Sequence, residues 1–590
     1  MMATVPFWSW SDPEVESRAQ ASVSVDNAWE LIVHFSNLVR ESGSADEQRA
    51  VEYITRKLAD WGIEHRVYRP VLLISLPRRA AMEVGRARRP VRAKTTSFSR
   101  PTSGWFEAEA VFVPAPESGP PGSDWTQALD QAADVAGKVA VVRGLANPGR
   151  VEDLTRLGAI GVVFVNPGER IHEMIVTPVW GSPDLDSVDR KPQVPVLSVN
   201  RTDGEALIAE VASGPVPIRM LTEVDEGWRP IPVIEAVIPG TESPDEFLLV
   251  HGHLDSWHVG VGDNATGDGA LLELARVLHL NRDRLRRTVR VAWWSGHSHG
   301  RYAGSTWYAD TFALQLYNSC VGHVNVDSPG CRWATRYDRV SMMAEASDFV
   351  CKAIRDMTGL DAQAERPPRA GDCSFNNIGL TTFFMLSSHM PDELQREKGY
   401  YPVGGCGGNI EWHTEADTLE IADRTNLERD IRVYLTAILR AVNAPVHPYN
   451  FGRVAEDFRR TLDRYAQSVG GRFDFEPVRF ELGRFERAIE AFNRRLDEAV
   501  SKKDLGREKF NWVLRRLGRI LIPINFTRTG RFRHDPARPV PPLPDLAPAE
   551  RLGQLPPDSD LARVIETHLV RGRNRVRWAL QEARELVEAV

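Results

Sequence analysis

The sequence predicts an α/β protein: a doubly wound, mostly parallel sheet with a β-rich insert and a helical C-terminal region. Buried apolar runs alternate with helical patterns between about residues 230 and 444, which is typical of parallel strands joined by crossover helices. Short β-type runs between glycine- and proline-rich loops fill the stretch before it, and strand patterns vanish after Pro445. We therefore expect three units, at residues 20–102 with 229–445, 103–228, and 446–590.

The N-terminal part of the first unit is predicted to be helical. Apolar residues recur at spacings of three and four between Asp26 and Gly62, with Gly43 and Ser44 marking a break between two helices. An arginine-rich stretch follows at residues 78–100. We interpret it as a solvated hairpin or linker, because the acidic total charge disfavours a nucleic-acid contact.

Four buried strands and one helix are predicted in the rest of this unit. Each strand is a short apolar run rich in β-branched or aromatic residues, and the helix has apolar residues all along its length. The strands are Phe247–Val250, Thr288–Trp294, Val321–Val326 and Thr381–Leu386, and the helix is Gly269–His279.

The C-terminal unit is predicted to be a helical bundle. Four stretches carry apolar residues at spacings of three and four, so each helix has one apolar stripe that needs a partner. The stretches begin near Val454, Phe485, Phe510 and Val576, and a proline-rich crossover at 536–557 interrupts them.

The amino-acid composition of the chain disfavours several classes of protein. The chain has 590 residues, 42 % hydrophobic and 26 % charged, with a net charge of -7, so a disordered chain or a dedicated nucleic-acid binder is disfavoured. No export signal or run of about 20 apolar residues is visible. Five cysteines without paired spacing argue against a disulfide framework. We expect a cytoplasmic protein with no membrane partner.

Histidine and aspartate side chains follow the predicted strands. In open α/β sheets ligands bind at the carboxyl ends of strands, and imidazole and carboxylate groups there suit zinc or manganese. A dinuclear hydrolase needs a bridging carboxylate and further ligands for each ion. Asp263 can bridge, and Asp255 can accept the other ring N–H of His253. The candidate ligands are His253 and Asp327 for one metal and His413 for the second.

Four motifs, HLDSW, GDNATG, VNVDSPG and WHTEADT, resemble those of the co-catalytic zinc exopeptidases of the aminopeptidase and glutamate carboxypeptidase type. The stretch GKVAVVRG to VPVLSVNRTDG resembles a protease-associated domain, and the C-terminal region resembles the transferrin receptor dimerisation domain. The resemblance implies two divalent ions per protomer, zinc first and manganese, cobalt or iron as alternatives. It also implies a homodimer and the ligand roles given above.

The chain departs from this family at one place. After the strand that ends at Trp294 the family carries two adjacent glutamates, a general base and a metal ligand. This chain has His297, Ser298 and His299 there, with one residue inserted before Gly304. Because serine is a poor ligand, we expect an imidazole to complete the second site. We favour His297 for proton transfer and His299 as the ligand, with the opposite assignment left open.

These observations favour a metal-dependent hydrolase of peptide or amide bonds in a small substrate, an exopeptidase or an amidase. A histidine base suits such chemistry because its reference pKa is about 6.5. Two alternatives stay open: a non-catalytic dimeric binding protein on the same scaffold, and a mononuclear enzyme of acyl transfer or cyclisation. The sequence does not identify the substrate.

Overall fold

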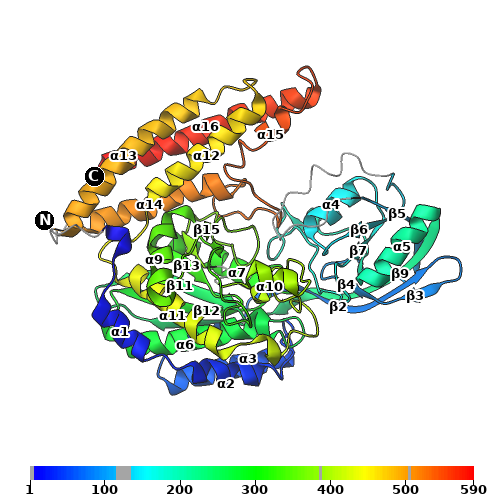
Figure 1. Cartoon of the computed structure of the whole chain (residues 1–590), viewed down its shortest axis with the longest axis horizontal. Coiled ribbons are helices and arrows are strands. Elements are labelled where there is room, and N and C mark those ends of the chain that lie inside the picture. Colours follow the sequence, from blue (N-terminus) through cyan, green and yellow to red (C-terminus); the bar gives the residue numbers. More distant parts are fainter. Residues whose placement is uncertain (1–5, 115–133, 385–387, 502–506) are drawn as a thin grey trace.

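The computed structural model describes residues 6–114, 134–384, 388–501 and 507–590. Figure 1 shows a central sheet covered by helices, a second sheet region beside it, and an arm of long helices across the top. No helix among the described residues is both long and apolar enough to cross a membrane.

The central sheet has six strands and a mixed topology. Its order is β1 (Glu64–Tyr68), β10 (Val233–Ile238), β12 (Arg287–Trp294), β11 (Ser243–His253), β13 (Cys320–Asn325) and β16 (Thr382–Phe383). The four strands from β12 to β16 are parallel, whereas β10 pairs antiparallel with β1 and β12. The parallel part is the one in which all strands end at the same edge.

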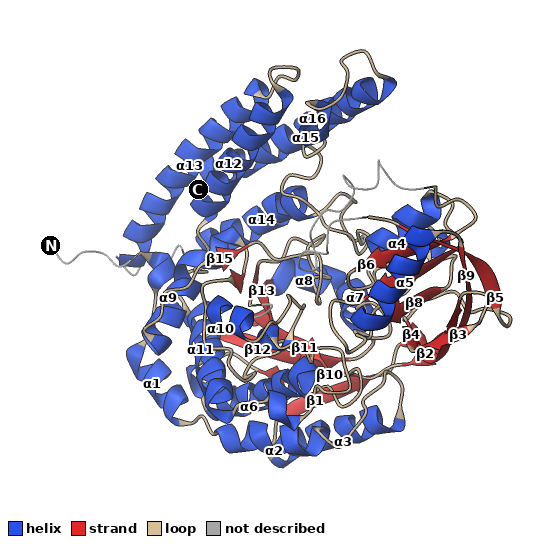
Figure 2. Cartoon of the chain, turned by 45° about the vertical axis from the view of Figure 1, so that its right-hand side comes forward, coloured by secondary structure: helices blue, strands red, loops and turns tan. Residues whose placement is uncertain are grey.

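Helices cover both faces of this sheet, as Figure 2 shows. Alternate residues of β11 enter different cores: Leu248 and Val250 join one, and Phe247 and Leu249 join the other. Such two-sided burial explains the continuous apolar run in the sequence. The helices of the first core are α2 (Val25–Phe35), α3 (Ala45–Asp60), α6 (Thr266–Leu280), α9 (Ser347–Thr358) and α11 (Arg424–Asn443), and α1 (Pro13–Ala21) lies beside them. The other face of the sheet is covered by α7 (Ala303–Thr311) and α8 (Ala313–Ser319).

The second sheet has eight strands and starts earlier than expected. Its order is β3 (Arg89–Val91), β2 (Val71–Val84), β9 (Val216–Pro230), β5 (Phe106–Phe112), β6 (Val139–Arg143), β7 (Gly161–Val165), β8 (Val196–Val199) and β4 (Ala93–Thr95). Strand β2 pairs with β9 from Val71 opposite Pro230 onward. The arginine-rich stretch forms a hairpin, one of the two structures expected for it, in which β2 pairs antiparallel with β3. Because this hairpin belongs to the second sheet, that sheet includes residues before position 103. Helices α4 (Pro148–Arg156) and α5 (Arg201–Ser213) pack on it.

The helical arm contains α12 (Phe451–Val469), α13 (Glu476–Ser501), α14 (Arg507–Phe526), α15 (Ala549–Leu552) and α16 (Asp560–Glu588). Its apolar stripes join the same core as one face of the central sheet. Helix α14 also carries Arg519, which is buried and donates to the carbonyl oxygens of Gly379 at 2.9 Å and Leu316 at 3.1 Å. This helix thus anchors the arm to the sheet region.

Candidate metal centre

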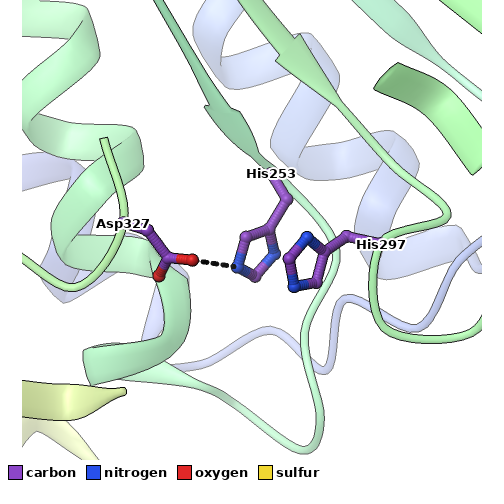
Figure 3. Close-up of side chains that lie close together, drawn as sticks. All are labelled: His253, His297 and Asp327. Atoms are coloured by element: carbon purple, nitrogen blue, oxygen red, sulfur yellow. Dashed lines mark ion pairs between the residues drawn. The ribbon is translucent and has the colours of Figure 1, made fainter. Parts of the chain in front are cut away.

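The predicted ligands gather at the carboxyl edge of the parallel strands. His253 is the last residue of β11, Asp327 follows β13, and His297 follows β12. Figure 3 shows the three side chains converging, with the two imidazole rings side by side. One ligand atom from each lies within 4.8 Å of the others, which is a separation that one metal ion can span.

Asp263 lies between two imidazoles. One carboxylate oxygen is 2.8 Å from Nε2 of His253, and the other is 3.0 Å from Nε2 of His413. Asp327 approaches the same His253 nitrogen at 3.8 Å. A carboxylate with one oxygen towards each of two histidines has the geometry of a bridging ligand.

The donor set fits a cation. Nε2 of His253 and Oδ1 of Asp263 are buried, and neither makes a hydrogen bond of acceptable geometry, although such groups are normally satisfied. Burial by itself lowers the pKa of His253, but the carboxylates of Asp263 and Asp327 raise it well above its ordinary value. Positive charge is therefore strongly favoured at this nitrogen, as a divalent metal would provide.

Asp255 positions His253 through its main chain rather than its side chain. The carbonyl oxygen of Asp255 is 2.8 Å from Nδ1 of His253, whereas the nearest carboxylate oxygen is 4.0 Å away. The carboxylate instead accepts the N–H groups of His297 at 3.1 Å and Ser298 at 2.9 Å, and the hydroxyl of Ser42 at 2.7 Å. Asp255 thus orients His253 as expected, but through its carbonyl oxygen. Its carboxylate instead holds the loop of His297 and Ser298.

His413 is held by the second sheet region. Its Nδ1 lies 2.8 Å from the carbonyl oxygen of Glu173, and its ring stacks on Trp412 with centroids 3.7 Å apart. Asp417 accepts the N–H of Gly262 at 2.6 Å and that of Asp263 at 3.0 Å. The loop of the bridging carboxylate and the loop of His413 are therefore tied together.

The two histidines after β12 point in different directions. The ring of His297 stacks on His253 with centroids 3.7 Å apart and planes at 11°, and its Nδ1 is 3.0 Å from Asp372. His299 is buried on the other side of the turn, where its Nδ1 is 3.0 Å from the hydroxyl of Ser42 and its ring packs against Trp257.

The geometry therefore differs from the expected division of roles. His297 lies with the candidate ligands, whereas His299 belongs to no cluster of three or more candidate ligands within the described parts of the chain. The two rings have different partners: Asp372 lies 3.0 Å from Nδ1 of His297, whereas the hydroxyl of Ser42 lies 3.0 Å from Nδ1 of His299. Ser298 is buried between them.

Comparisons with known proteins find a family match and similar folds. Residues 233–438 match peptidase family M28. This domain belongs to that family. Similar curated proteins are the probable glutamate carboxypeptidase VP8 of Zea mays, 25 % identical over 38 % of this chain and 37 % of that protein, and human carboxypeptidase Q, 24 % identical over 46 % and 57 %. The chain thus spans only part of the length of these relatives.

Solved structures share the fold of the M28 domain and its surroundings. A peptidase M28 precursor from Shewanella amazonensis aligns with a TM-score of 0.55 at 18 % identity, covering 73 % of this chain and 96 % of that one. A zinc aminopeptidase from Bacillus subtilis aligns with a TM-score of 0.52 at 18 % identity, covering 71 % and 95 %. Identities this low show a shared fold and no more.

Several residues that shape the M28 site have no motif in the sequence. Asp372 lies 75 positions after His297, and Ser42 lies more than 200 positions before Asp255. Arg40 is fully buried and donates to the carbonyl oxygens of Leu254 at 2.9 Å and Gly260 at 3.0 Å. In the sequence, each of these residues is marked only by its place next to a predicted helix or strand. Many other residues share that position, so the sequence does not identify these three as part of the site.

A cavity of about 1060 Å³ opens above the site. Asp263, His297, Asp327 and His413 line its floor. Its walls come from all three regions, at residues 145–156 of the second sheet region, 366–371 of the central region, and 536–551, which lead into α15. The cavity therefore lies where the three regions meet.

Proposed function

We propose that this chain is a metal-dependent hydrolase of peptide or amide bonds, with His297 as the group that accepts the proton of the attacking water. The observation that carries the proposal is the Asp263 carboxylate, whose two oxygens face His253 and His413 at 2.8 and 3.0 Å. Divalent metals bound there supply an acidified water and polarise the scissile carbonyl. His253 and Asp327 would hold one ion, His413 the second, and Asp263 both.

Asp372 supports the role of His297. Burial opposes its negative charge, but the neighbouring His297 and other imidazoles hold the pKa of this carboxyl at about 2. Its other oxygen accepts the hydroxyl of Ser305 at 2.6 Å. A carboxylate can only accept hydrogen bonds, so Nδ1 of His297 carries the hydrogen. Nε2 is then the ring nitrogen that can accept a proton at the site.

The proposal includes two zinc ions and a homodimer. Zinc is favoured by the imidazole and carboxylate donors and by the likeness to zinc aminopeptidases. The helical arm exposes large apolar side chains, Phe480, Val564 and Trp578, which supports a contact between two copies there. Light scattering should then give twice 66.1 kDa, and a monomer at micromolar concentration would refute the dimer.

One observation favours a second candidate. His253, His297 and Asp327 by themselves form a three-ligand cluster, which is enough for one metal with an open position. In that arrangement His297 is a ligand, and the chain would be a mononuclear enzyme of acyl transfer or cyclisation. The two candidates differ in metal content, two ions or one.

The test combines metal analysis with a hydrolysis screen. Protein purified without chelator is expected to contain about two zinc ions per protomer and to cleave some members of a panel of dipeptides and amino-acid amides, with loss of activity after chelation. Asp372→Asn should keep the metal and lower turnover by about 10 to 100-fold. Fully loaded protein that cleaves no peptide or amide would contradict the proposal and favour the binding-protein alternative.

A further inference from the structure

A chain of buried hydrogen bonds runs from the proposed base to the second sheet region. One carboxylate oxygen of Asp372 lies 3.0 Å from Nδ1 of His297, and the other accepts the hydroxyl of Ser305 at 2.6 Å. The hydroxyl oxygens of Ser305 and Ser374 are 2.9 Å apart, and the indole N–H of Trp180 donates to Ser374 at 2.9 Å. The last four of these residues along the chain of bonds, from Asp372 to Trp180, are each at most 4 % exposed. Water therefore does not replace a bond that is lost here.

The two ends of this chain fix the direction in which its hydrogens point. An indole nitrogen can only donate a hydrogen bond, and a carboxylate can only accept one. Each serine has a single hydrogen, so the order that satisfies the whole chain runs from Trp180 to Ser374, then to Ser305, and on to the carboxylate. The competing acceptors lie farther away, since the carbonyl oxygen of Tyr302 is 3.2 Å from Ser305 and the hydroxyl of Thr306 is 3.3 Å from Ser374. Every donor thus points towards the carboxylate beside the base.

The loop that carries Trp180 is fixed on the turn after β12. It lies between β7 and β8 and so belongs to the second sheet region. The N–H of Gly181 donates to the carbonyl oxygen of Arg301 at 2.7 Å. Gly181 has a φ of 72°, and a Cβ atom on it would lie 2.7 Å from side-chain atoms of Thr306. Glycine at this position therefore allows the two backbones to approach closely.

Tyr302 provides a second contact between this loop and the base. Its ring packs on Trp180 with centroids 4.3 Å apart, and it meets the ring of His297 edge-on at 4.8 Å. Its hydroxyl accepts the N–H of Gly371, the residue before Asp372, at 2.9 Å. Packing and hydrogen bonding therefore both lead from Trp180 to His297. A variant that keeps an aromatic ring at position 180 and lacks the N–H separates the two.

We propose that Trp180 is a positioning residue for the base His297. Through its bond to Ser374, and from there through Ser305, it fixes the carboxylate that orients the imidazole ring. Turnover then depends on the docking of the second sheet region, because a small misplacement of a proton-transfer group lowers the rate. Neither Trp180 nor Ser374 is among the described residues that line the cavity above the metal centre, so a substrate there does not contact them. The kinetic part of this inference rests on the proposed hydrolase function, and the structural part does not.

The kinetic test uses the zinc-loaded full chain and a peptide or amide that the parent cleaves. Trp180→Phe removes the indole N–H and keeps a ring, so kcat should fall by about threefold to tenfold, the range for one neutral hydrogen bond. Ser305→Ala removes the donor to the carboxylate itself and should lower kcat by roughly 10 to 100-fold. Zinc content and KM should not change, because loss of an interaction that acts on the transition state lowers kcat alone.

Trp257→Phe is the matched control. Trp257 is 6 % exposed and packs against His299 beside the same metal centre, but its Nε1 makes no hydrogen bond within the described parts of the chain. This variant should keep the kcat of the parent.

The double variant Trp180→Phe with Ser374→Ala tests whether the two residues act through one chain. If they do, the double variant should lose no more activity than Ser374→Ala alone, because each change interrupts the same path. Ser374→Ala also serves as the test variant if Trp180→Phe does not fold.

A second measurement follows the Nδ1–H of His297 without reference to activity. In protein with isotopically labelled histidine this proton is detected by NMR, and the spectrum of His297→Gln identifies its signal. Its exchange with water should be about threefold to tenfold faster in Trp180→Phe, the range for one lost hydrogen bond, and unchanged in Trp257→Phe. A parent protein without this protected proton would contradict the hydrogen bond on which the inference depends.

Equal kcat and equal exchange in the parent and Trp180→Phe would overturn the inference, and so would losses that multiply in the double variant. Faster exchange in Trp180→Phe, in a protein that cleaves no peptide or amide, would refute the hydrolase and keep the positioning role. Cleavage by Trp180→Phe at the rate of the parent would refute only the positioning role.

Discussion

The two proposed metal positions would be held by different parts of the fold. His253 and Asp327 stand at the ends of the neighbouring strands β11 and β13, so one sheet sets their separation. His413 lies in a loop, and its ring is oriented by the carbonyl oxygen of Glu173 in the second sheet region. The first position is therefore built within one region, whereas the second depends on the packing of two.

A salt-bridged cluster joins the two regions beside His413. Lys94 of β4 lies 2.9 Å from Glu173 and 2.7 Å from Glu415, and His258 lies 3.2 Å from Glu173. The lysine pairs with both carboxylates, so their grouping is explained without a metal ion. Its effect is to hold the second sheet region against the loop that carries His413.

The largest loss of activity is expected when Asp263, the proposed ligand of both metal ions, is replaced. Asp263→Asn replaces a bridging carboxylate with a neutral amide, so both ions should bind more weakly. Activity should fall by more than the 10 to 100-fold that changes around ligands typically cause. Metal analysis after dialysis and rate measurement check this, and a variant that kept two ions and full activity would show that Asp263 does not bridge.

The second prediction separates the two histidines after β12. His297→Gln should lower turnover by roughly a hundredfold to ten-thousandfold, the range for loss of a general base, and leave both ions bound. His299→Gln should act mainly on thermal stability, because His299 packs behind the site against Ser42 and Trp257. Loss of one ion in the His297 variant would instead favour the mononuclear arrangement, and loss of metal only in the His299 variant would restore its role as a ligand.

The third prediction tests the dependence of the second position on the second sheet region. Lys94→Met breaks both contacts of the lysine with Glu173 and Glu415, so the affinity for the second ion should fall by up to about tenfold. The first ion should be unaffected. The control is Lys191→Met, which breaks the ion pair with Glu226 in the same region and touches neither Glu173 nor Glu415 in any recorded ion pair. Equal losses of both ions would show that the two positions are not held independently.

The smallest effect on activity is expected far from the metal, where the helical arm meets the central region. Burial raises the pKa of Glu345 to about 7, and its carboxyl accepts the hydroxyl of Thr381 at 2.8 Å. Because the folded pKa is raised, the stability from the protonated form is fully present below about pH 4.5 and is lost as the pH rises through 7.

Glu345→Gln cannot titrate, so its free energy of unfolding should exceed that of the parent at pH 8, by up to about 3 kcal/mol, and match it near pH 4.5. Urea unfolding at both pH values measures this difference. Glu365→Gln, at an exposed glutamate, should show none. A parent as stable as the variant at pH 8 would mean that Glu345 is ionised without cost.

Much of the fold follows from patterns of local spacing. The buried strands at 247–250 and 288–294 lie within β11 and β12, and the helical stretches after Pro445 lie within α12, α13, α14 and α16. Two-sided burial and apolar stripes are properties of neighbouring residues, so a sequence displays them directly. The hairpin predicted in the arginine-rich stretch is present as β2 and β3, but the exposed Arg78 and Arg79 of β2 gave no sign that it belongs to the second sheet.

Local spacing in the chain determined the strands, the helices and the identity of the residues that meet at the strand ends: His253, Asp263, Asp327 and His413. Only the tertiary structure decided that His297 lies among the candidate ligands while His299 packs against Ser42 and Trp257, and that Asp372 contacts His297. The reason is physical: a hydrogen bond such as that of Asp255 to the turn after β12 depends on where two distant segments meet. The pattern of apolar residues in either segment does not indicate which distant segment it will contact.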